Sequence, residues 1–118
     1  MAQLSRNEAR KVKHLRERQH IFGTAQKPRL NVFKSHQNFY AQLIDDVKGI
    51  TLVAVSTYKK GEYHGNIQSA KELGKLMAEK INHLKIKELV FDRGGYIYHG
   101  RVKAFAESVR EHAKGVKF

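Results

Sequence analysis

The sequence contains no cysteine, no tryptophan and a single proline, Pro28, among its 118 residues. Without cysteine the chain can form no disulfide framework, no thiolate zinc site and no thiol nucleophile. No apolar run approaches the roughly 20 residues that a membrane-spanning helix needs. The first twenty residues also lack the apolar stretch of a signal peptide. We therefore expect a soluble cytosolic protein with no membrane partner.

Acidic residues are scarce relative to basic ones. The chain has 11 Asp and Glu against 23 Lys and Arg, which gives a net charge of +12 and a pI near 10.1. Such an excess makes the folded chain repel itself unless a polyanion binds to it. Nucleic acid is the first candidate for this partner, and an anionic lipid surface is the second.

The basic residues are concentrated near the N-terminus. The first 29 residues hold eight Lys and Arg against two Glu, a net charge of +6 and half of the total. Residues 4–20 are good helix formers without a wide apolar stripe, so a core is not expected to hold this helix. It is either a solvated tail or a basic arm that becomes ordered on RNA, and the charge favours the arm. We assign residues 1–28 to the arm and its hinge, and residues 29–118 to a globular domain.

The globular part has the pattern of an α/β fold. Residues 29–35, 39–44 and 50–57 are rich in strand formers and are joined by short polar turns, which predicts an antiparallel meander. Apolar residues at helical spacing predict helices over 67–84 and 102–113, and 88–91 reads as a short strand. The order strand, helix, strand over residues 50–91 implies a helical crossover connection, which places the last strand parallel to a neighbouring strand of the sheet. We expect one domain with a mixed four-stranded sheet, two packed helices and the basic N-terminal helical arm.

The segment from Phe91 to Arg101, FDRGGYIYHGR, combines several features that suit RNA. The adjacent Gly94 and Gly95 allow positive φ and close approach of a partner. The N-terminus of the following helix favours an anion. Arginines can pair with phosphates, and Tyr96 and Tyr98, two residues apart in an extended segment, could stack on unpaired bases. The alternative is an ordinary loop whose tyrosines lie partly in the core.

Enzymatic readings have less support. The segment matches neither dinucleotide-binding nor phosphate-loop motifs. A nuclease would need converging carboxylates, for which Asp45, Asp46 and Asp92 are the candidates. The seven histidines show no i, i+4 pair, so no metal site and no cofactor are expected. Besides a structural RNA binder, the sequence leaves open this metal-dependent nuclease and a nonspecific binder of RNA or anionic lipid.

Three runs of sequence carry a specific resemblance: residues 27–35 (KPRLNVFKS), 40–46 (YAQLIDD) and above all 91–104 (FDRGGYIYHGRVKA). They resemble the eighteenth large-subunit ribosomal protein of bacteria, and the likeness covers essentially the whole chain. Lys27 and Lys34 stand where arginine is expected in that family. Lysine keeps the charge there but loses the planar fork of arginine.

The resemblance implies a structural protein of the cytoplasmic ribosome with no catalytic activity. Its implied partners are 5S rRNA, 23S rRNA and neighbouring proteins of the central protuberance, including the fifth large-subunit protein. Carried over by position, and with the turn residue His36 added, the residues implied to face RNA are Arg6, Arg10, Lys11, Lys13, Arg16, Arg18, Arg29, Lys34, Ser35, His36, Arg93, Gly94, Gly95, Tyr96, Tyr98, His99, Gly100 and Arg101.

Overall fold

The computed structural model describes residues 5–35, 38–57, 66–113 and 115–118. Within these ranges the helices and strands follow in the order α1 (Arg6–Glu17), β1 (Arg29–Lys34), β2 (Phe39–Asp45), β3 (Ile50–Ser56), α2 (Ile67–His83), β4 (Val90–Asp92) and α3 (Gly100–His112). No helix among them is long and apolar enough to cross a lipid bilayer.

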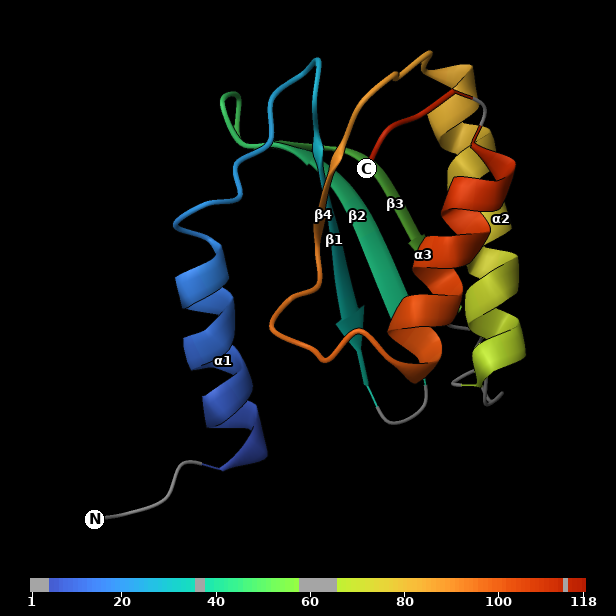
Figure 1. The fold of residues 1–118 in the computed structure, drawn as a ribbon. Coiled ribbons are helices and arrows are strands. Elements are labelled where there is room, and N and C mark those ends of the chain that lie inside the picture. The colour runs from blue at the N-terminus through green and yellow to red at the C-terminus, as the bar shows by residue number, and fades with distance from the viewer. Residues whose placement is uncertain (1–4, 36–37, 58–65, 114) are drawn as a thin grey trace.

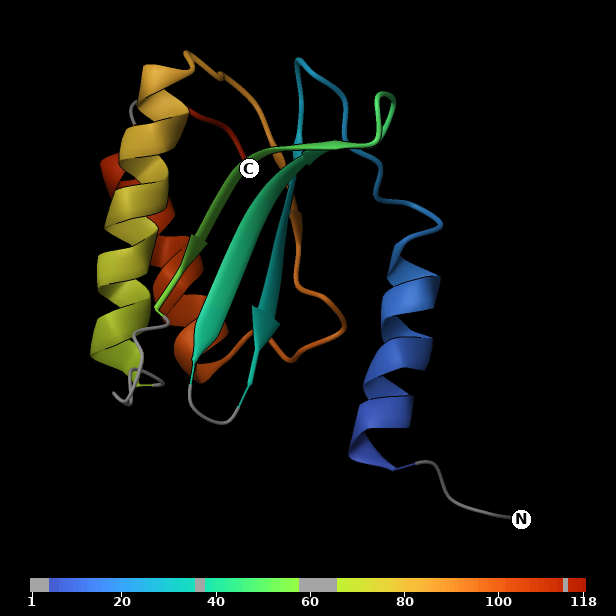
Figure 2. The ribbon, with the colours of Figure 1, turned by 180° about the vertical axis from the view of Figure 1, so that it is seen from behind.

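The four strands form one mixed sheet in the order β3-β2-β1-β4. The pairs β1–β2 and β2–β3 are antiparallel, whereas β1 and β4 are parallel. Helices α2 and α3 lie side by side on one face of the sheet, and α1 stands on the opposite side of the molecule (Figures 1 and 2). The predicted α/β fold with a meander and a parallel fourth strand is confirmed.

The core lies between the sheet and the α2–α3 layer. Alternate residues of β1, Leu30 and Val32, are fully or almost fully buried against the helices, because successive side chains of a strand point to opposite faces. Phe39 of β2 meets Phe105 of α3 with ring centroids 5.2 Å apart. Arg29, Asn31 and Phe33 therefore point to the other face, the one that α1 approaches.

The predicted ends of the elements lie within three residues of the observed ends, and β4 is among the elements that shift. Its strand was expected at residues 88–91 but spans Val90–Asp92. Register with β1 sets this range, since Arg29 pairs with Val90 and Asn31 with Asp92. The shift has a functional consequence, because it makes Asp92 the last strand residue and directs its carboxylate to the face of the sheet that faces α1.

Candidate nucleic-acid interface

A buried carboxylate lies where the sheet, the loop after β4 and helix α1 meet. Asp92 is fully buried, and each of its oxygens accepts hydrogen bonds. Oδ1 accepts the backbone N–H of Gly94 at 2.9 Å. Oδ2 accepts from three side chains: Arg29 Nη1 at 2.7 Å, Asn31 Nδ2 at 3.0 Å and His14 Nε2 at 3.0 Å. The carboxylate thus joins β1, β4, the glycine turn and α1.

These hydrogen bonds determine the charge of the buried group. Burial by itself would raise the pKa of Asp92, but the hydrogen bonds from the four donors outweigh that effect and hold the pKa below its ordinary value. Asp92 is therefore ionised at neutral pH. An ionised carboxylate only accepts hydrogen bonds, so the His14 ring must donate through Nε2.

Arg29 connects Asp92 to a second carboxylate, Asp46. Its Nε and Nη2 donate to Asp46 at 2.9 and 3.1 Å. Burial would lower the pKa of Arg29, but the hydrogen bonds to Asp46 and Asp92 raise it above its ordinary value. The same hydrogen bonding to Arg29 lowers the pKa of Asp46, which also accepts the N–H of Gly23 at 2.8 Å. Arg18 Nη1 lies 3.6 Å from Asp46 Oδ2. Asp46 therefore contacts both Arg18, at the start of the hinge, and Gly23 within it.

The arrangement argues against the metal-dependent nuclease. Asp46 and Asp92 both converge on the Arg29 guanidinium, which already fills the place a cation would take. Asp45 turns away from them and accepts the N–H groups of Val47 and Lys48 as a turn residue. Across the described residues no three His, Asp or Glu side chains gather in a way that could hold a metal ion.

Helix α1 docks on the loop after β4 through polar contacts, since none of its residues is buried. Arg10 Nη1 donates to the Gly94 carbonyl at 2.9 Å, and His14 reaches Asp92. The Arg10 carbonyl lies so close to Gly95 that a Cβ there would approach it to 2.2 Å. Gly95 has a φ of +81°. The close approach expected of the glycine pair is thus made by α1.

The two tyrosines of the loop have different partners within the protein. The Tyr96 hydroxyl accepts the N–H of Lys34 and donates to its carbonyl, which holds the ring on β1. Tyr98 packs edge-on against Phe91 and accepts a hydrogen bond from Arg110. The N–H of His99 bonds to the carbonyl of Ile97 at 2.8 Å, so the chain turns at Tyr98. Tyr96 belongs to the core and Tyr98 packs against it, as the alternative of partly buried tyrosines expected.

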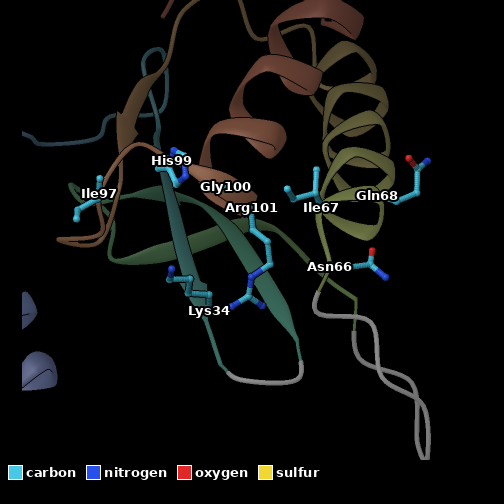
Figure 3. Close-up of a pocket in the computed structure, with 8 residues that line it drawn as sticks. All are labelled: Lys34, Asn66, Ile67, Gln68, Ile97, His99, Gly100 and Arg101. Atoms are coloured by element: carbon cyan, nitrogen blue, oxygen red, sulfur yellow. The ribbon is translucent and has the colours of Figure 1, made fainter.

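A first hollow lies where α2 and α3 begin, beside the end of β1 (Figure 3). Lys34, His99, Gly100 and Arg101 line it, and Arg101 reaches from α3 toward the end of β1, where Lys34 lies. Arg101 is held in place because its guanidinium donates to the carbonyls of Ser35 and Asn38. Partial burial, and then the positive charge of Arg101, lower the pKa of Lys34. Two cations kept this close favour an anion between them.

A second hollow, which we call the α1 groove, lies between α1 on one side and the end of β1 with residues 95–97 on the other. Arg6, Arg10 and Lys13 line it from α1. Lys34 and Ile97 line both hollows, so the two form one continuous surface. This surface runs from the basic arm, across the end of the sheet, to the first turn of α3.

The structure brings half of the predicted RNA-facing residues together on this surface: Arg6, Arg10, Lys13, Lys34, Gly95, Tyr96, His99, Gly100 and Arg101. Lys11 and Arg16 are exposed on α1 outside the hollows, and Ser35 lies beside Arg101 in the β1–β2 turn. Four others have partners within the protein: Arg18, Arg29 and Arg93 in ion pairs, and Gly94 through its carbonyl to Arg10. Tyr98 faces Arg110, and His36 lies outside the described residues.

Sequence reasoning missed two exposed apolar side chains of the groove, Phe33 and Ile97. A signal for Phe33 was present, because β1 alternates and Phe33 is out of phase with the buried Leu30 and Val32. It also missed His14 and Asn31 as ligands of Asp92. Their contacts span 78 and 61 positions of sequence, and no local pattern reports such pairs.

Comparisons with known proteins identify the family. The family model described as ribosomal L18 of archaea, bacteria, mitochondria and chloroplast matches residues 4–118. The large ribosomal subunit protein uL18 of Mycoplasmopsis pulmonis is 59% identical over 120 residues, covering 100% of both chains. Its counterpart in Mycoplasmopsis synoviae is 62% identical over 117 residues and 98% of both chains. That of Bacillus cytotoxicus is 54% identical over 109 residues, covering 90% of this chain and 91% of its own. The chain therefore belongs to the ribosomal L18 family.

Proposed function

We propose that this chain, a protein of the large ribosomal subunit, binds 5S rRNA and helps to attach it to 23S rRNA in the central protuberance, beside the fifth large-subunit protein. The family assignment supports the ribosomal role, since its homologues are structural ribosomal proteins and not enzymes. The cytoplasmic ribosome is accordingly its location. The main support for RNA binding is the continuous cationic surface formed by the α1 groove and the hollow beside it.

Four cations of α1, two of them in the α1 groove, are available to an external anion. Arg6, Lys11, Lys13 and Arg16 make no hydrogen bond or ion pair with the described part of the chain, and no acidic side chain lines either hollow. Cations with no internal partner gain most from RNA phosphates, because binding releases the condensed counterions of the RNA. By contrast, Arg18, Arg29 and Arg93 would have to leave internal carboxylates, so we propose that they position the arm.

A competition experiment tests this function. Labelled 5S rRNA is bound to the purified protein at near-physiological salt, and excess transfer RNA or excess unlabelled 5S rRNA is then added. We expect transfer RNA to displace little of the complex and 5S rRNA to displace all of it. Equal displacement by both RNAs would favour the second candidate, a nonspecific polyanion binder, which the net charge of +12 alone would support.

The exposed cations of α1 are expected to contribute affinity without selectivity. Replacing Arg16 or Lys11 with alanine should weaken binding to 5S rRNA and to transfer RNA by the same factor. Each change should also reduce the slope of log K against log salt by about 0.7–0.9, the value for one lost phosphate contact. Filter binding at several salt concentrations measures both effects. Lys75→Ala, at an exposed position of α2, is the matched control and should leave the slope unchanged.

A further inference from the structure

The floor of the α1 groove is apolar, although the groove lies in a strongly basic region. Phe33 is 47% exposed and Ile97 is 74% exposed, whereas Tyr96, which also lines the groove, is only 9% exposed. The groove has a volume of about 830 Å³, within the range of about 300–1,000 Å³ usual for ligand sites. Exposed aromatic and aliphatic side chains that line a hollow suit a ligand with an apolar face.

The rings of the floor are held in fixed positions. The Tyr96 hydroxyl is bonded to the backbone of Lys34, and Phe33 is a residue of β1 with its ring 6.0 Å from that of Tyr40. The guanidinium of Arg10 lies 4.7 Å from the Tyr96 centroid and 5.8 Å from that of Phe33. Its hydrogen bonds to Gly94 and Asn7 prevent it from turning away. The groove therefore presents the exposed ring of Phe33 with the Arg10 guanidinium held beside it.

Positive charges stand on both walls. Arg6 and Lys13 project from α1 with no partner in the described chain, and Lys34 stands on the opposite wall with its Nζ 5.2 Å from the Tyr96 centroid. No Asp or Glu lines the groove. A ligand that fits must bring an apolar, stackable surface to the floor and negative charge to both walls.

We infer that the α1 groove holds one unpaired nucleotide of ribosomal RNA, with its base against Phe33 and Ile97 and its flanking phosphates at Arg6, Lys13 and Lys34. This inference rests on the proposed function and specifies how the RNA is recognised. A nucleotide carries a flat π face with a phosphate on either side, and proteins commonly stack such bases on aromatic rings and arginine planes. Paired bases cannot supply this face, because an A-form duplex keeps them stacked inside. An acidic, apolar peptide segment is the competing occupant.

Crosslinking from the groove identifies the occupant. Ile97→p-benzoylphenylalanine places a photoreactive group at an exposed position of the groove, and the variant is assembled into large ribosomal subunits before irradiation. We expect a crosslink to a single unpaired nucleotide. A crosslink to a base-paired helix, or to another ribosomal protein, would overturn the inference. A photoreactive group at Leu76, an exposed residue of α2, is the control for nonspecific reaction.

Affinity measurements test stacking separately. Phe33→Ala should weaken binding of the crosslinked RNA by between about 5-fold and 150-fold, the range for loss of one stacked base. The salt slope should not change, because no charge is removed. Ile50→Ala is the matched control, since Ile50 is also 47% exposed but lies on the far strand, β3. An RNA abasic at the crosslinked nucleotide should bind the unchanged protein as weakly as Phe33→Ala binds intact RNA.

The combination of both changes gives the decisive comparison. Phe33→Ala should lose no further affinity on the abasic RNA, because one contact cannot be lost twice. Additive losses, or a Phe33→Ala protein that binds as tightly as the Ile50→Ala control, would overturn the inference. The identity of the crosslinked RNA tests the proposed function independently. A crosslink to an unpaired nucleotide of 23S rRNA would support the inference that the groove holds a nucleotide. The same result would contradict the assignment of this surface to 5S rRNA.

Discussion

Replacing Gly95 with alanine is expected to release α1 from the domain while the domain itself stays folded. A Cβ at Gly95 would lie 2.2 Å from the Arg10 carbonyl and 3.1 Å from the His14 Cβ, so the helix backbone would have to move. No residue of α1 is buried, and an isolated helix of 12 residues is marginal in water. Amide hydrogen exchange should therefore show α1 exchanging nearly as fast as a free peptide.

A matched substitution separates this displacement from backbone strain. Gly115 also has a positive φ, +70°, but a Cβ there meets nothing within 4 Å. Gly115→Ala should share the strain of about 1–3 kcal/mol and leave the exchange of α1 unchanged. Slow exchange of α1 in Gly95→Ala would mean that this contact does not hold the helix.

Release of α1 should also weaken RNA binding. The arm keeps its cations, so the salt slope should be unchanged, but α1 must then be ordered at the moment of binding. The loss of pre-organisation should reduce the affinity for 5S rRNA about tenfold, equivalent to about 1.4 kcal/mol. An affinity equal to that of Gly115→Ala would contradict a role for the docked arm in forming the α1 groove.

The sheet and the two packed helices could be predicted because local patterns specify them. Alternation in β1 and apolar spacing in α2 report which face is buried, without knowledge of the partner. The bounds of β4 could not be predicted in the same way. Only three residues long, the strand is defined by its register with β1, and this register depends on packing far away in the sequence.

The docking of α1 was beyond local reasoning for a different physical reason. Its sequence correctly indicates a helix without an apolar stripe. Because no stripe marks a buried face, the sequence does not indicate which side of the helix contacts the domain. The contacts instead are single hydrogen bonds, from Arg10 to Gly94 and from His14 to Asp92, and one glycine that permits approach. The loop was correctly singled out for its Gly-Gly pair, but the sequence could not say what approaches the pair.

Replacing Asp92 with asparagine is expected to destabilise the domain by about 3 kcal/mol, the lower end of the range for breaking a buried ion pair. Asparagine keeps the shape but removes the charge that faces Arg29, and its amide N–H₂ cannot accept the hydrogen bonds that Oδ2 accepts now. The lower end applies because Arg29 keeps its pair with Asp46. Thermal unfolding should show a midpoint lower by about 10 °C.

Asp45 provides the matched control for this change. It is as buried as Asp92, but within the described ranges its carboxylate accepts only from the turn N–H groups of Val47 and Lys48. An asparagine oxygen is an adequate substitute for that acceptor. Asp45→Asn should therefore cost less than about 1 kcal/mol. Equal losses for the two variants would mean that burial of any carboxylate, rather than the pair with Arg29, accounts for the effect.

The pH dependence of the Asp92→Asn loss provides a second test. The hydrogen bonds hold the pKa of folded Asp92 below its ordinary value of 3.8, which applies to the unfolded chain. The unfolded chain therefore binds more protons near that pH, and the contribution of Asp92 is complete above it and is lost as the pH falls through the folded pKa. Urea unfolding measures the difference in free energy of unfolding between the unchanged protein and Asp92→Asn. This difference should be complete at about pH 6 and smaller at about pH 3. A difference independent of pH would mean that the variant fails through packing, and that the ionised carboxylate does not hold α1, β1 and β4 together.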